Sequence, residues 1–207
     1  MVEMYSGFNS LILEPTAATG TEGKKMLHYD SHEKRLKESG WERAPTPQEA
    51  MGLIIAHLEG RLDQKLGKIA ANMLERHGEF FCHAVQVSDG NLFFYENATG
   101  LFWNGECYKV YGNNSWHKSQ VSFKVAGINH GWNDLEFISK ISPEVIEYLY
   151  SRKYQELPQA IRESGRIYFP DDNLVWPIGR ACKPDFGILL DCRVRGSRGV
   201  RLKNDER

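Results

Sequence analysis

The spacing of apolar residues changes near Gly78, from the period of a helix to that of β-strands. Upstream of it, Thr46-Pro47-Gln48-Glu49 forms a capping box with proline at the first helical position. Apolar residues then recur every three or four positions, at Met51, Ile55, Leu58, Leu62, Leu66, Ile69 and Met73. An unbroken helix ending before Gly78 would be roughly 46 Å long at about 1.5 Å per residue. The segment 46–78 therefore predicts either a long helix or a helix broken near Gly60.

Residues 80–125 have the pattern of short strands separated by tight turns. Asp89-Gly90 and Asn104-Gly105 are dipeptides that accept the positive φ angles of two-residue hairpins. They separate the apolar segments FFCHAVQVS, NLFFYE, TGLFW and ECYKVY. This arrangement predicts an antiparallel meander of three or four strands, to which 121–125 adds another.

The remaining segments complete one α+β domain over residues 1–207. We expect a first strand at 8–13, a short helix ending at Ser39, and a helix over 143–164 that restarts at Pro158. The strands RIYF, LVWPI and FGILLDC and a basic hairpin follow within 166–203. The predicted fold is an antiparallel β meander packed against the helical region 46–78 and a second helix in the C-terminal half.

The composition of the chain limits the cellular compartment and the binding partners that we expect for it. Lys and Arg number 26 against 27 Asp and Glu, so no field of the whole molecule attracts nucleic acid or lipid. The N-terminus has no basic and apolar leader pattern, and no apolar run approaches the roughly 18 residues of a membrane helix. Four widely spaced cysteines favour reduced thiols. We therefore expect a cytoplasmic protein that does not bind a membrane.

The strongest local charge lies at the C-terminal end. Residues 193–203 carry five positive charges without an acid, on Arg193, Arg195, Arg198, Arg201 and Lys203. Arginine pairs bidentately with phosphate and carboxylate, so such a hairpin suits nucleic acid, a phosphorylated ligand or an acidic partner. The alternative is an edge hairpin whose charge only prevents pairing between chains.

A second anion-binding candidate is Lys24, within the segment 18–25 (ATGTEGKK). This segment nearly matches a phosphate-binding P-loop, but Lys25 replaces the hydroxyl residue that would hold Mg²⁺, and Glu22 adds negative charge. The meander also conflicts with the parallel sheet that such loops join. A flexible solvated loop explains the segment better than a nucleotide-binding loop does, and we expect no cofactor.

Histidine and cysteine indicate no complete catalytic or metal centre. Polar residues of the connection 127–134, His130 and Asp134 among them, are catalytic candidates, although turn chemistry explains the same composition. Cys82 and His83 are expected on opposite faces of a strand, which excludes a local nucleophile and base pair. No third ligand accompanies His28 and His32, so we expect no metal.

The sequence does not determine the function, and two classes fit it. The first is a non-enzymatic binding or assembly protein that uses the C-terminal arginines and self-associates through the long helical region. The second is a small enzyme acting on a phosphorylated or acidic ligand, with Lys24, His130, Asp134 and the arginines in its site. We favour the first, because no nucleophile and base pair, metal triad or complete cofactor motif can be assembled.

Overall fold

A computed structural model describes residues 11–13, 29–74, 79–96, 98, 100–110, 120–182 and 200–202, and it has an α+β architecture. Its main sheet contains six antiparallel strands in the order β6-β3-β2-β9-β8-β7. The strands are β2 (Glu79–Ser88), β3 (Asn91–Tyr95), β6 (Gln120–Lys124), β7 (Gly131–Asp134), β8 (Gly165–Phe169) and β9 (Val175–Cys182). Two small sheets pair β4 (Leu101–Trp103) with β5 (Tyr108–Val110) and β1 (Leu11–Leu13) with β10 (Val200–Leu202).

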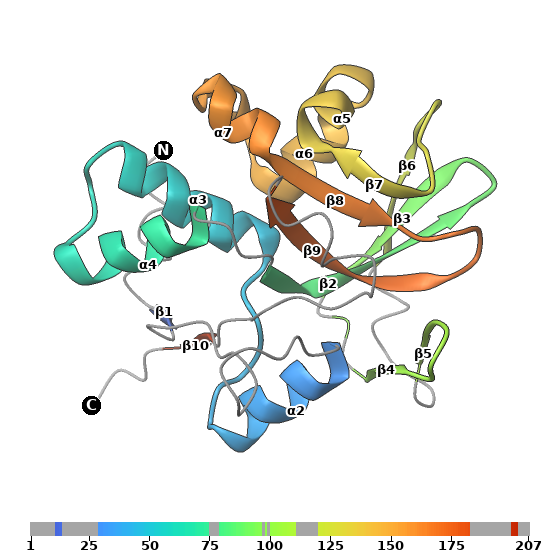
Figure 1. Ribbon diagram of the computed structural model, residues 1–207, viewed down its shortest axis with the longest axis horizontal. Coiled ribbons are helices and arrows are strands. Elements are labelled where there is room, and N and C mark those ends of the chain that lie inside the picture. The colour runs from blue at the N-terminus through green and yellow to red at the C-terminus, as the bar shows by residue number, and fades with distance from the viewer. Residues whose placement is uncertain are drawn as a thin grey trace.

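Helices gather mainly on one side of the main sheet (Figure 1). They are α3 (Pro47–Leu58), α4 (Gln64–Leu74), α5 (Leu135–Ile141), α6 (Pro143–Tyr150), the 3₁₀ helix η2 (Arg152–Glu156) and α7 (Gln159–Ser164). The helix α2 (Tyr29–Glu38) lies below the sheet in this view, with the β4–β5 hairpin. The main core lies between the helices and the sheet and includes Leu53, Ile54, Phe94, Ile138 and Phe169.

The helical region 46–78 is divided rather than continuous. Its predicted start is confirmed: the Thr46 hydroxyl accepts from the Glu49 backbone N–H at 3.1 Å, and the Glu49 carboxylate accepts from the Thr46 N–H at 2.8 Å. Helix α3 ends at Leu58, and Gly60 follows with φ of +69°. The Asp63 carboxylate then accepts from the N–H of Leu66 in the first turn of α4. The helical region is therefore interrupted near Gly60, as the sequence predicted.

The meander prediction is wrong in its pairing. The Asp89-Gly90 turn does join β2 to β3, with φ of 50° and 71°. The Asn104-Gly105 turn instead joins β4 to β5, which form a separate sheet, and β6 then pairs with β3. The β4–β5 hairpin is thus an insertion between two neighbouring strands of the main sheet. Local turn signals fix hairpins, whereas pairing between distant segments depends on packing of the whole sheet.

Two further segments differ from the prediction. Residues 131–134 form the edge strand β7, although their Gly and Asn content indicated a loop. The helix predicted over 143–164 is divided into α6, η2 and α7, and Ser151, with φ of 73°, lies at the first division. The RIYF and LVWPI strands are confirmed within β8 and β9. The FGILLDC strand and most of the basic hairpin lie outside the described residues.

Candidate functional site

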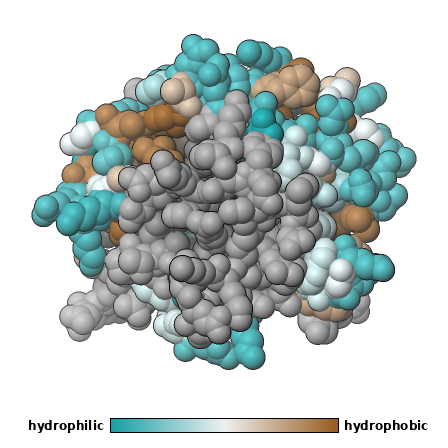
Figure 2. All heavy atoms as spheres, viewed as in Figure 1, coloured by the Kyte–Doolittle hydropathy of each residue, from teal (hydrophilic) through white to brown (hydrophobic). Residues whose placement is uncertain are grey.

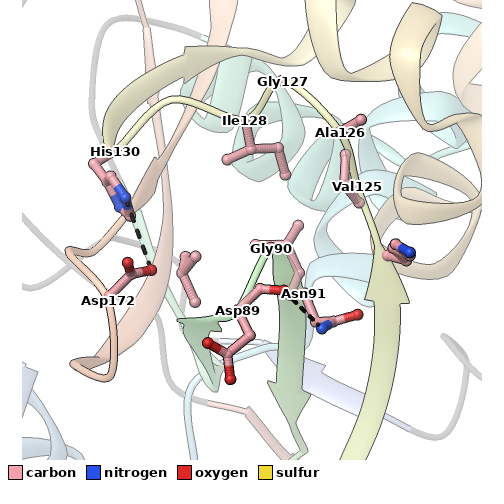
Figure 3. A pocket seen from close by; sticks show the side chains of 12 residues that line it. Asp89, Gly90, Asn91, Val125, Ala126, Gly127, Ile128, His130 and Asp172 are labelled. Carbon is pink, nitrogen blue, oxygen red and sulfur yellow. Dashed lines mark hydrogen bonds and ion pairs between the residues drawn. The ribbon is translucent and has the colours of Figure 1, made fainter.

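Three chain connections meet at one end of the main sheet and enclose a hollow of about 350 Å³, the sheet-end pocket (Figure 3). They are the β2–β3 turn, the β6–β7 connection and the β8–β9 turn. The pocket is lined by Val87, Asp89, Gly90, Asn91, Leu92, Lys124, Val125, Ala126, Gly127, Ile128, His130 and Asp172. Binding residues are often carried on loops held by a rigid scaffold, and this arrangement is of that kind.

Hydrogen bonds fasten the β8–β9 turn to strand β2. Asn173 donates its backbone N–H to the Val87 carbonyl at 2.7 Å and accepts a bond from the Ser88 hydroxyl on its side-chain oxygen at 2.9 Å. The Gln86 side chain donates to the Asn173 carbonyl at 3.2 Å. Asn173 has φ of 66°, a conformation that asparagine tolerates better than most residues. The turn that carries Asp172 is therefore held beside the β2–β3 turn.

The β6–β7 connection is held by a buried side chain. Asn133, on β7, donates its amide to the carbonyl of Asn129 at 2.8 Å and to that of Gly131 at 3.0 Å. Gly127 and Gly131 adopt φ of 82° and 97°, which residues with a side chain rarely take. The loop that presents His130 is thus closed on itself by one amide group.

His130 bridges two of these connections. Its Nδ1 lies 2.8 Å from the carbonyl oxygen of Pro170, and since a carbonyl can only accept, Nδ1 carries the proton. Its Nε2 lies 3.8 Å from Oδ1 of Asp172. The His130 and Asp172 side chains are 44% and 62% exposed, so solvent or a ligand reaches both. In the neutral ring Nε2 is therefore the nitrogen that can accept a proton or a hydrogen bond.

The walls of the pocket combine apolar and charged groups. Val87, Leu92 and Val125 are buried and form the apolar part with the half-buried Ile128. Asp89 and Lys124 are exposed at the rim. Neither side chain forms an ion pair or a hydrogen bond within the part of the chain that the structure describes. Charged groups of both signs are thus available to a ligand.

The residues proposed from the sequence do not form one site. His130 lines the pocket just before β7, whereas Asp134 is the last residue of that strand, roughly 13 Å away at about 3.3 Å per residue. Asp134 forms an ion pair with Arg166 of the neighbouring strand. Lys24, Arg193, Arg195 and Arg198 lie outside the described residues, and Arg201 is described only as backbone of β10, paired with Ile12.

The three lining residues with carboxylate or ammonium side chains, Asp89, Lys124 and Asp172, are not among the site residues that the sequence predicts. The sequence indicates Asp89 only as a turn residue, and Lys124 and Asp172 have no motif around them. The pairing of β6 with β3 is what brings Lys124 to the pocket, opposite Asn91. The one available signal was the Asp89-Gly90 turn, because turns at the same end of a sheet are candidates for a shared site.

Cys82 and His83 correct a second expectation, because their side chains are neighbours rather than on opposite faces. Cys82 Sγ lies 3.4 Å from Nδ1 of His83. The register of β2 against β9 shifts between Phe80 and Ala84, and an irregular strand need not alternate its side chains. Burial raises the pKa of the Cys82 thiol to about 12 and lowers the pKa of His83. The pair therefore holds a neutral thiol, which is a poor nucleophile.

An ion pair lies beside this thiol and joins it to the start of α3. The Arg43 guanidinium contacts both oxygens of the Glu49 carboxylate, at 2.7 and 2.8 Å, and Cys82 Sγ at 4.0 Å. Burial alone would raise the pKa of Glu49, but the bonds from Arg43 and from the Thr46 N–H outweigh it and lower that pKa. The role of this cluster is to join the loop before α3 to β2.

The structure describes no group of three or more His, Cys, Asp and Glu side chains placed to bind a metal. No helix within the described ranges combines the length and apolar character that a bilayer crossing needs. In comparisons with known proteins, no family model, curated protein or solved structure matches this chain.

Proposed function

We propose that this protein is a non-enzymatic binding protein whose ligand is a small molecule taken up in the sheet-end pocket. The observation that carries this proposal is an apolar wall of Val87, Leu92 and Val125 beneath charged groups that have no partner among the described residues. The volume of about 350 Å³ is at the lower end of the roughly 300–1,000 Å³ typical of small-molecule sites. Sites of this kind combine an apolar lining with a few polar groups that orient the ligand.

A fragment screen followed by two-dimensional amide NMR tests this proposal. Ligands of the pocket are expected to shift amide resonances of the β6–β7 connection and of the β2–β3 turn together. Ile128→Trp fills the pocket with a larger side chain and should abolish these shifts. Ile141→Trp, the same change at an exposed isoleucine on α5, is the matched control and should retain them. A library in which no compound shifts both connections would refute the proposal.

The alternative is a small enzyme acting on a phosphorylated or acidic ligand. The observation that favours it is His130 Nε2, which can accept a proton at the mouth of the pocket. Asp134 supports it less, because its carboxylate is paired with Arg166. His130→Gln distinguishes the two classes. An enzyme would lose turnover of a bound ligand by two or more orders of magnitude, the usual contribution of a general base, while retaining the ligand.

A second binding function is proposed for the C-terminal arginines, supported by the five positive charges of 193–203. A polyanion that contacts Arg193, Arg195, Arg198 and Arg201 releases counterions, so log affinity should fall against log salt with a slope of roughly −3. Arg198→Ala should reduce the magnitude of that slope by about one unit without unfolding the protein.

Two control measurements separate a polyanion site from a merely charged edge. Single-stranded DNA and heparin should both bind at low salt if the proposal holds. If the arginines only prevent association between chains, neither probe binds, and their replacement lowers solubility instead. An acidic protein partner would give a third pattern, in which binding is salt-dependent but DNA does not compete.

A further inference from the structure

We infer that the sheet-end pocket binds a zwitterion, a free α-amino acid with an aliphatic side chain. The inference rests on the proposed small-molecule binding and specifies the ligand class. It follows from three features of the pocket: a cation with no ion pair among the described residues, a set of acceptors for an ammonium group, and an aliphatic wall.

The cation is Lys124, and Asp89 is an anion of the same pocket lining whose side chain also has no ion pair among the described residues. Lys124 is paired in register with Asn91, two residues after Asp89, so strands β6 and β3 bring the two charged residues to the same rim. Even so, no Lys124 to Asp89 ion pair is among those of the described residues. A ligand that covers the rim removes water from both charges, which is costly unless each gains an opposite charge. A ligand with one charge satisfies only one of them.

The acceptors are three groups from different connections. Asp89 and Asp172 contribute carboxylates from the two turns. His130 contributes Nε2, because its Nδ1–H is already used by the Pro170 carbonyl. An α-ammonium group has three N–H donors and no acceptor, so it matches these three acceptors. The carboxylate of the same ligand then pairs with Lys124.

The apolar wall and the size of the pocket specify the rest of the ligand. Val87, Leu92, Val125 and Ile128 are all aliphatic, which favours a branched aliphatic side chain. The pocket volume suits a molecule of amino-acid or dipeptide size rather than a dinucleotide.

Three probes of nearly the same shape test the inference by calorimetry and NMR. They are L-leucine, 4-methylpentanoate, which lacks the ammonium group, and 3-methylbutylamine, which lacks the carboxylate. Charge-assisted hydrogen bonds contribute enough that each analogue is expected to bind roughly 10- to 100-fold more weakly than leucine. An analogue that binds as tightly as leucine would show that one of the two charges is not recognised and would overturn the inference.

Two variants assign each charge to its partner. Asparagine tolerates the positive φ at position 89, so Asp89→Asn keeps the turn. This variant should bind leucine and 3-methylbutylamine more weakly but 4-methylpentanoate as before. Lys124→Met should bind leucine and 4-methylpentanoate more weakly but 3-methylbutylamine as before. Asp171→Asn, beside Asp172 but outside the pocket lining, and Lys68→Met, on α4, are the matched controls and should change nothing. Equal loss of all three probes in either pocket variant would contradict the assignment.

Failure of this inference can be told apart from failure of the proposed function. If leucine gives no heat and no resonance shifts while another fragment shifts the pocket amides, the ligand class is wrong and the pocket is still a binding site. If no compound of any charge shifts those amides, both proposals are wrong.

Discussion

Glu49 shows how one side chain can serve two elements. Its carboxylate accepts from the Thr46 N–H in the capping box and from Arg43, whose guanidinium also contacts Cys82 of β2. The capping box could be predicted because its four residues are adjacent in the sequence. The contact between Arg43 and Cys82 could not be predicted, since these two residues are 39 positions apart in the sequence.

Thr46→Ala should lower the free energy of unfolding by about 1 kcal/mol, because the Glu49 N–H loses its acceptor at the start of α3. Chemical denaturation monitored by circular dichroism measures the change. Thr46→Ser keeps the hydroxyl group and is expected to remain close to the wild type. An unchanged denaturation midpoint in the alanine variant would contradict the role of the cap.

The burial of His83 predicts that the folded chain becomes less stable as the pH falls below neutrality. Burial lowers the pKa of its ring in the folded chain below the ordinary 6.5, so the unfolded chain binds a proton that the folded chain does not. The free energy of unfolding should therefore fall as the pH decreases through about 6.5, at up to about 1.4 kcal/mol per pH unit from this group.

Urea denaturation at pH 7.5 and pH 5.5 measures this effect. His83→Gln removes the titrating ring, so the difference between the two pH values should shrink by the share that His83 contributes. Equal pH dependence in the wild type and the His83 variant would show that this ring does not control the effect.

At the scale of elements, the β8–β9 turn depends on Asn173. Asn173→Ala removes the acceptor of the Ser88 hydroxyl and places an alanine at φ of 66°, so the variant should lose about 1–3 kcal/mol of stability. Asn173→Gly loses the same bond but tolerates the conformation, and it should lose less. Thermal unfolding of both variants measures the two contributions. If the glycine variant were no more stable than the alanine variant, the positive φ at position 173 would not strain the alanine backbone.

Elements were predictable where their signals are local. Pro47 and Pro143 each stand at the start of a helix, and Asp89-Gly90 forms the expected hairpin turn. Strand β7 was missed because Trp132 is its only large apolar residue, and it becomes a strand by pairing with β8. Pro177 also disfavours a central strand, yet it lies in β9 between β2 and β8, beside the register shift of β2 that tolerates it.

The site was less predictable than the fold, because its residues come from connections that only the finished sheet brings together. His130 was singled out from the composition of its loop, but its partner is Asp172 rather than Asp134. That partnership depends on the β8–β9 hairpin lying next to β2, and this placement has no local signal in the sequence. The adjacency of Cys82 and His83 depends on the irregularity of the same strand pair.

At the scale of the whole molecule, self-association through the helical region remains a prediction. The division of 46–78 reduces the surface available, because Met51, Ile55, Ile69 and Met73 are buried within the chain. Leu58, at the end of α3, stays 40% exposed, and Figure 2 shows an apolar patch on the side where Figure 1 places α3 and α4. Light scattering at high concentration should detect a dimer that Leu58→Ser weakens. A strictly monomeric species would rule the interface out.

The pairing of β2 with β9 also affects how the chain folds. Glu79 pairs with Arg180, so the two central strands are roughly a hundred residues apart in the sequence, and a sheet closed by such distant contacts forms slowly. During synthesis at about 5–20 residues per second, strands β2 and β3 wait for seconds before β9 emerges. Throughout that interval the β9-facing edge of β2 lacks its partner, and an unpaired apolar edge promotes aggregation. The nascent chain is therefore expected to need a chaperone at this stage more than the finished protein does.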